Sequence, residues 1–138
     1  LELGEPVEPE RSDGLWKSTC FEAFVKDADG AGYLEFNFAP SSSWAAYRFT
    51  GYRESMAELP IASAPELGND ASESHFALEA IFEITPELSG KDLLLAVAAV
   101  IEELNGTKSY WSLAHTAGAP DFHHPDCFTL RLPARAEL

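Results

Sequence analysis

The sequence has few basic residues, few cysteines and no long apolar run. Nine Lys and Arg residues stand against 23 Asp and Glu residues, so the net charge is -14. Nucleic acids and anionic membranes both attract basic surfaces, and this composition therefore argues against both as partners. The longest apolar run, from Leu93 to Ile101, is far shorter than the roughly 20 residues that span a bilayer.

Cysteine is represented only by Cys20 and Cys127, which are too few for a disulfide scaffold. Each cysteine stands beside a Phe in a strand-like segment, and we expect two small buried thiols. One disulfide bond is the alternative. The sequence shows no signal peptide, and a cytoplasmic location is the favoured expectation.

Hydrophobic material is plentiful by contrast. The 138 residues are 46% hydrophobic and include nine Phe, four Tyr and three Trp. This composition suits a single domain over residues 1–138 with one core. Apolar and polar residues alternate over 19–25, 33–38 and 44–50, and short Gly, Pro and Ser turns separate these segments. Period-2 alternation of this kind predicts an antiparallel β-meander.

The rest of the chain extends the same pattern. Residues 93–103 form an apolar run that ends at the turn-forming Asn105-Gly106 pair, and we expect a buried strand followed by a hairpin. We further expect strands over 56–61, 75–82, 108–113 and 127–132, and a loop over 65–74. The sequence thus predicts an all-β fold, a two-sheet antiparallel sandwich with little helix.

Local signatures of catalysis are missing. We find no nucleophile elbow, no phosphate-binding loop and no dinucleotide fingerprint, so we expect no enzymatic activity. His115, His123, His124 and Asp126 lie close together in the sequence. Adjacent histidines in a strand point to opposite faces, and the spacing is not that of a structural zinc site. We therefore expect no metal, with a metal site at these histidines as the alternative.

Polar side chains gather on one face of the predicted meander. If the three strands pair in order, this face carries Glu22, Glu35, Asn37, Trp44 and Arg48. Carboxylates, an amide, a guanidinium and an indole on a rigid sheet suit a sugar, because polar groups bind its hydroxyls and the ring packs against its C–H face. The alternative is a solvated face with cross-strand salt bridges from Arg48.

Two finer expectations concern aromatic and histidine side chains. Trp44 follows a serine turn and is the tryptophan that we expect to be most exposed, whereas Trp111 lies in mid-strand and should be buried. The loop before Cys127 contains several Gly and Pro residues and needs side-chain hydrogen bonds to stay ordered. We expect Asp121 to cap backbone N–H groups, with His123 turned inward and His124 outward.

Three blocks of the sequence are similar to a known family. They contain the motifs Trp-x-x-x-Cys-Phe-Glu at 16–22, Trp-Ala-Ala-Tyr-Arg at 44–48 and Pro-Asp-Phe-His-His-Pro at 120–125. In combination they resemble bacterial DOMON-like domains, which are similar to family-9 carbohydrate-binding modules. The quoted blocks run over 13–25, 35–49, 109–115 and 120–128, and the resemblance covers residues 1 to about 133.

The resemblance implies a β-sandwich of jelly-roll type and a sugar or haem as ligand. Haem-binding relatives use Met and His as axial ligands, but Met56 is the only methionine here and lies in a weakly patterned segment, so we expect no cofactor. Relatives carry strands before the segment that resembles residues 1–9, so we expect either that the given chain is a fragment without these N-terminal strands or that a second copy covers the unpaired edge. The candidate ligand-binding residues are Trp16, Glu22, Asn37, Trp44, Arg48, Trp111 and His123.

These observations together favour a non-catalytic module that binds a small, carbohydrate-like ligand as a monomer or a homodimer. One alternative is a structural or protein-interaction domain whose familiar blocks only build the core. A haem- or metal-binding domain is the other.

Overall fold

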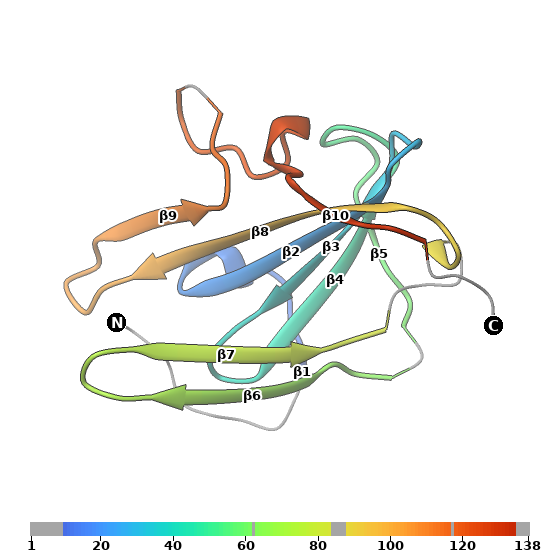
Figure 1. Ribbon diagram of the computed structural model, residues 1–138. Coiled ribbons are helices and arrows are strands. Elements are labelled where there is room, and N and C mark those ends of the chain that lie inside the picture. Colours follow the sequence, from blue (N-terminus) through green and yellow to red (C-terminus); the bar gives the residue numbers. More distant parts are fainter. Residues whose placement is uncertain (1–9, 62, 84–87, 117, 135–138) are drawn as a thin grey trace.

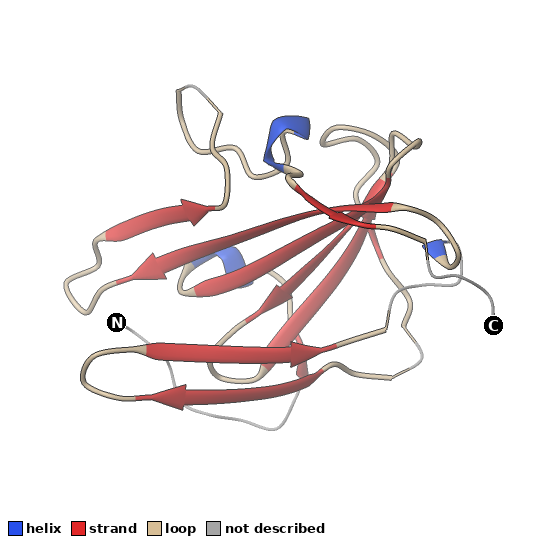
Figure 2. Cartoon of the chain, viewed as in Figure 1, coloured by secondary structure: helices blue, strands red, loops and turns tan. Residues whose placement is uncertain are grey.

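The computed structural model describes residues 10–61, 63–83, 88–116 and 118–134. Over these residues the fold is mostly β-strand, with only short helical turns, as Figure 2 shows. This confirms the all-β class. The strands are β1 (Glu10–Arg11), β2 (Cys20–Asp27), β3 (Tyr33–Phe38), β4 (Ser43–Phe49), β5 (Ala57–Glu58), β6 (Glu66–Ala71), β7 (Phe76–Ile81), β8 (Leu93–Glu102), β9 (Lys108–Ser112) and β10 (Leu130–Leu132). The described 3₁₀ turns are η1 (Leu15–Lys17) and η3 (Pro125–Cys127).

One large sheet and one two-stranded sheet make up the architecture (Figure 1). The large sheet has the order β1-β4-β3-β2-β8-β10, with β5 added to β4 and β9 added to β8. Its pairings are antiparallel except that β1 runs parallel to β4. The sheet is therefore mixed rather than purely antiparallel, because the chain enters as a short extended segment beside β4.

The predicted meander is confirmed as β2-β3-β4, and its register decides which side chains share a face. Glu35 pairs with Phe24 on one side and with Tyr47 on the other. Residues directly opposite each other in a sheet lie on the same face. Asn37, two residues after Glu35, pairs with Glu22 on one side and with Ala45 on the other, so these side chains lie on the same face as Glu35. One face of the meander thus carries both glutamates and the asparagine.

Trp44 and Arg48 lie on the opposite face, so the expectation that they join Glu22 and Glu35 was wrong. Phe38 pairs with Trp44, and Leu34 pairs with Arg48. The parity is set by the turn that joins β3 to β4, where the N–H of Ala39 donates to the carbonyl of Ser43. Ser42 takes a left-handed conformation with φ 77°, as short three-residue hairpins require.

Other strand predictions had mixed outcomes. The apolar run from Leu93 is a strand, and the Asn105-Gly106 hairpin after it is confirmed, with Gly106 at φ 86°. Residues 65–74 are not a loop, because β6 occupies most of them and pairs with β7. The last strand is shorter than expected, since Cys127 lies in η3 and β10 begins at Leu130. The sequence also predicts a turn over residues 85–90, and part of this segment lies outside the described residues.

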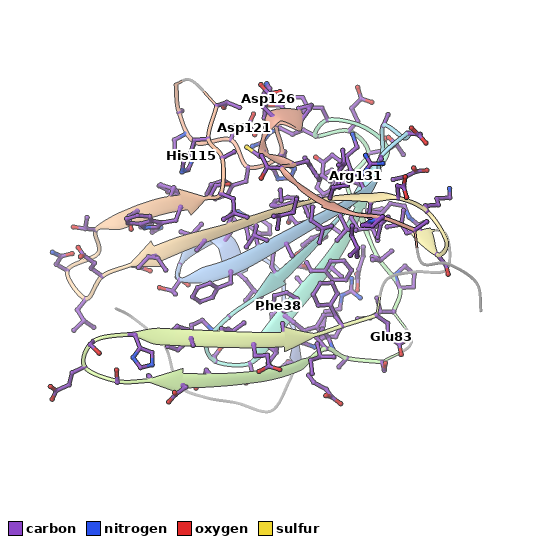
Figure 3. The ribbon with its side chains drawn as sticks, viewed as in Figure 1. Phe38, Glu83, His115, Asp121, Asp126 and Arg131 are labelled. Atoms are coloured by element: carbon purple, nitrogen blue, oxygen red, sulfur yellow. The ribbon has the colours of Figure 1, made fainter. Side chains whose placement is uncertain are left out.

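The two faces of the large sheet are covered differently. Phe36, Phe38 and Trp44 are buried on the face that the β6-β7 hairpin covers, where Leu67 and Leu78 pack against them. The other face is covered by η1 and by the chain between β9 and β10. Phe24, Tyr33, Tyr47, Phe122 and Phe128 form its buried cluster. Figure 3 shows Phe38 on the hairpin side and Asp121 on the loop above the opposite side.

Cys20 and Cys127 are both free and buried, as expected. Burial raises the pKa of each thiol above its usual value, and nearby carboxylates raise it further. Both cysteines are therefore small core residues, and neither has the thiolate character that reactive cysteines need.

Candidate functional site

A cavity of about 410 Å³ opens on the face of the large sheet that η1 and the C-terminal loops cover. Its floor comes from β2, β3, β4 and β8, and its walls come from η1, β9, the segment between β4 and β5, and the loop before η3. The lining residues are Trp16, Glu22, Glu35, Phe49, Arg53, Met56, Val100, Tyr110, Pro120, Phe122 and His123. The volume falls within the range of small-molecule sites, roughly 300–1,000 Å³.

Glu22 is the most unusual group on the floor. Only 6% of the residue is exposed, and its carboxyl group makes no hydrogen bond or ion pair with any of the described residues. Burial and the nearby charge of Glu35 raise its pKa from 4.5 to about 8, against a smaller opposing effect of Arg53. Near neutral pH this carboxyl group is therefore mostly protonated, so it can both donate and accept a hydrogen bond.

Glu35 stands beside it in a continuous hydrogen-bond chain. Asn37 Nδ2 donates to Glu35 Oε2 over 3.1 Å, and His123 Nε2 lies 3.1 Å from Glu35 Oε1. The Tyr33 hydroxyl lies 2.6 Å from His123 Nδ1 and accepts the backbone N–H of Arg53. One tautomer satisfies all these contacts: Tyr33 donates to Nδ1, and Nε2–H donates to Glu35. His123 is thereby fixed in a single orientation.

A second set of contacts holds the rim of the cavity. Arg53 Nη2 donates to Asp121 Oδ1 over 2.7 Å, and the Tyr52 hydroxyl donates to Asp121 Oδ2. Burial alone would raise the pKa of Asp121, but hydrogen bonds from Tyr52 and Arg53 and from the backbone N–H of His123 hold it below its usual value. The segment after β4 is thus fastened to the loop before η3, and the two loops form one wall.

The expected orientation of the two histidines is confirmed. The side chain of His123 is 15% exposed and lies inward, whereas that of His124 is 38% exposed. The expectation that Asp121 caps backbone N–H groups holds for His123, although its main partners are Tyr52 and Arg53. His124 Nδ1 accepts the backbone N–H of Asp126 and so caps η3, a role that the sequence did not suggest.

Aromatic side chains form the other walls. Trp16 is 39% exposed and meets Tyr47 edge-on, with ring centroids 6.2 Å apart. Tyr110 is 45% exposed and lies near Phe122, with centroids 6.3 Å apart. These rings give a ligand flat apolar surfaces above a floor of carboxyl and imidazole groups, which is the composition of many small-molecule sites.

The structure brings together some of the predicted site residues and separates others. Trp16, Glu22 and His123 line the cavity, and Asn37 lies behind it, bound to Glu35. The Asn37 amide oxygen is buried without a hydrogen bond from the described residues. Trp44, Arg48 and Trp111 do not line the cavity.

The exposure expected for two tryptophans was reversed. Trp44 is only 6% exposed, because its strand parity turns it toward the β6-β7 hairpin, and the Arg11 guanidinium lies over its ring. Trp111 is 63% exposed, because β9 is joined to β8 alone among the described strands and nothing described there covers this side of it. Its neighbour Tyr110 pairs with Val100 and faces the cavity instead.

Several residues that line the cavity were not predicted from the sequence. Tyr110 could have been found from the alternation around Trp111 once the face was known. Arg53 and Met56 lie in an irregular segment, where no periodicity indicates direction. Phe49, Val100 and Phe122 resemble ordinary core residues in the sequence, and only the tertiary fold brings them to the cavity.

Haem does not fit this site, although Met56 and His123 both line it. Both ring nitrogens of His123 are engaged, Nδ1 with Tyr33 and Nε2 with Glu35. An axial ligand needs a free nitrogen lone pair, and freeing one would break a hydrogen bond inside a buried cluster. For metal ions, the described residues contain no group of three or more His, Cys, Asp or Glu side chains that could hold one.

No family model, curated protein or solved structure matches this chain. Within the part of the chain that the structure describes, no helix is long and apolar enough to cross a membrane. The function must therefore be inferred from the cavity itself.

Proposed function

We propose that this protein is a non-catalytic module that binds a small, carbohydrate-like ligand in the cavity above β2 and β3. The observation that carries the proposal is the pairing of a polar floor with aromatic walls in one cavity of about 410 Å³. A sugar ring has an apolar C–H face and a rim of hydroxyl groups, so it matches both surfaces at once.

The floor offers a sugar both kinds of hydrogen bond. The carboxyl group of Glu22, with its pKa of about 8, can donate to one hydroxyl and accept from another. Arg53 adds N–H donors at the rim. Both carboxylate oxygens of Glu35 already accept hydrogen bonds, so this group is suited to orienting His123 rather than to attacking a bound ligand. This arrangement supports binding without turnover.

The relationship to DOMON-like domains and the jelly-roll topology are part of the same proposal. Of the eleven lining residues, all but Arg53, Met56 and Val100 lie in the sequence blocks that resemble this family. A resemblance that came only from shared core residues would have no reason to gather around one cavity. The large sheet backed by a smaller one is compatible with a jelly roll.

A calorimetric titration with mono- and disaccharides tests this proposal. We expect binding that is lost on Trp16→Ala and kept on Trp111→Ala, because Trp16 lines the cavity and Trp111 faces away from it. We also expect the bound sugar to be recovered chemically unchanged. Absence of binding by every sugar at millimolar concentration, or equal effects of the two substitutions, would contradict the proposal.

One observation favours a protein-interaction domain as the second candidate. Apolar side chains remain exposed along β8, β9 and β10, on the face that the β6-β7 hairpin covers further along the sheet. They are Val97, Trp111, Leu113, Leu130 and Leu132. Contiguous exposed apolar surface is typical of interaction sites. If this face is the functional one, Trp111→Ser will abolish partner binding or self-association in sedimentation experiments, whereas Trp16→Ala will not.

A further inference from the structure

The floor of the cavity contains more acidic than basic side chains. Glu22 and Glu35 both line it, and each is less than a tenth exposed. Burial of two charged carboxylates side by side is unfavourable unless a positive charge compensates them or one of them takes up a proton. Acidic groups with strongly shifted pKa values are concentrated at functional sites, so a buried pair of this kind commonly takes part in binding or catalysis.

The positive groups nearby are already engaged. Arg53 makes an ion pair with Asp121, and about half of its side chain is exposed to solvent. Both ring nitrogens of His123 are engaged, Nε2 with Glu35 and Nδ1 with Tyr33. The described groups therefore leave Glu22 without an ion-pair partner inside the cavity.

We propose that the cavity is selective for a cationic ligand, a ring compound whose protonated amine lies between the carboxyl groups of Glu22 and Glu35. This inference rests on the proposed function and narrows its ligand to the class of amino sugars. The ammonium supplies hydrogen-bond donors to a carboxyl group that has no hydrogen-bond partner among the described residues. It also supplies a positive charge beside Glu35 and beside the carboxylate that Glu22 forms when it loses its proton.

The aromatic walls support the same choice. Trp16 and Tyr110 line the cavity from two sides, and Phe122 lies beside Tyr110. The faces of aromatic rings attract cations, most strongly in the case of Trp and where solvent is excluded. A neutral sugar would gain ring packing but not this attraction.

Binding of a cation should expel one proton from the protein. Glu22 is mostly protonated near neutral pH, since its pKa is about 8. The groups that face it are Glu35 from β3, Arg53 from the segment after β4, His123 from the loop before η3, Tyr110 from β9 and Cys20 on its own strand. An ammonium ion beside Glu22 favours the carboxylate, so the proton is released while the ligand keeps its own.

Four compounds test this inference as a two-by-two set. Glucose and glucosamine share a hydroxylated ring and differ in charge, and cyclohexanol and cyclohexylamine differ in the same way without the other hydroxyl groups. Each is titrated into the intact chain by calorimetry in two buffers of different ionisation enthalpy, so that the proton count is measured together with the affinity. Glu22→Gln is measured in parallel, because it keeps the shape and removes the ionisation.

We expect glucosamine to bind at least about tenfold more tightly than glucose, with release of close to one proton below pH 7. Its affinity should rise by up to about tenfold per pH unit between about pH 5.5 and 7. In Glu22→Gln the proton release and the preference for the amine should both disappear.

The other possible outcomes distinguish the cationic selectivity from the proposed sugar binding. Equal affinity of glucose and glucosamine would overturn the cationic selectivity and leave the proposed sugar binding intact. Binding of cyclohexylamine alone would overturn the sugar as ligand and keep the selectivity for a cation. If none of the four compounds binds, both proposals fail. Unchanged proton release in a folded Glu22→Gln variant would show that another group takes up the charge and would remove Glu22 from the site.

Discussion

Replacement of Glu22 by Gln should remove the pH dependence of stability that this buried acid imposes. Folding raises the pKa of Glu22 from 4.5 to about 8. Between these values the folded protein holds a proton that the unfolded chain has lost. The stability contributed by Glu22 is therefore complete below about pH 4.5 and falls as the pH rises toward 8.

The size of the effect follows from the shift. Each pH unit in this window lowers the free energy of unfolding by about 1.4 kcal/mol, so the total over the whole shift is on the order of 5 kcal/mol. Glu22 is buried, and solvent screening therefore reduces this value little. Between about pH 5 and about pH 7.5, the variant should gain about 3 kcal/mol relative to the wild-type protein.

Urea unfolding followed by tryptophan fluorescence at several pH values measures this difference. Subtraction of the two curves cancels groups that titrate alike in both proteins. Glu79→Gln is the matched control, because it places the same substitution on an exposed position of a strand, and its curve should follow that of the wild-type protein. A difference between wild type and Glu22→Gln that stays constant with pH would refute the reasoning.

Three further predictions concern substitutions elsewhere in the protein. His123→Ala should lower the free energy of unfolding in urea by about 1–3 kcal/mol, because His123 joins Tyr33 to Glu35. It should also weaken ligand binding, because His123 lines the cavity. An unchanged stability or an unchanged ligand affinity would argue against this double role. Trp44→Ala should lower it by about 3–5 kcal/mol and Trp111→Ala by less than about 0.5 kcal/mol, and similar losses would contradict the assigned burial. Asp121→Asn should weaken ligand binding several-fold in calorimetry by loosening Arg53, whereas Asp126→Asn, at an exposed carboxylate, should not.

Much of the fold could be predicted from the sequence, because period-2 alternation is a local property. The meander, the long strand from Leu93 and the Asn105-Gly106 hairpin all follow from patterns within a few residues. Strand β6 was missed because its Gly, Asn and Asp residues are typical of loops. It is a strand because Leu67 packs against the large sheet and its backbone pairs with β7.

The site was harder to predict, because strand parity decides it. One turn residue more or less between β3 and β4 would have placed Trp44 and Arg48 with Glu22. The positive φ of Ser42 allows the observed turn, which places Trp44 and Arg48 on the face opposite Glu22. A serine at this position does not by itself predict a positive φ. His123 was found because its loop needs side-chain hydrogen bonds. Arg53 and Tyr33 were not, because their contacts with the site depend on loops that only the tertiary structure brings together.

The central claim is that the cavity above Glu22 and Glu35 is where this protein binds its ligand, and the three tryptophans offer a direct test. In a two-dimensional ¹H–¹⁵N NMR spectrum, each indole N–H gives its own signal, which substitutions can assign. Trp16 lines the cavity, Trp44 is buried beneath the hairpin, and Trp111 is exposed on the other face. We predict that glucosamine titration shifts the Trp16 signal in a saturable way and leaves the other two unchanged. A saturable shift of Trp111 with none at Trp16 would contradict the claim.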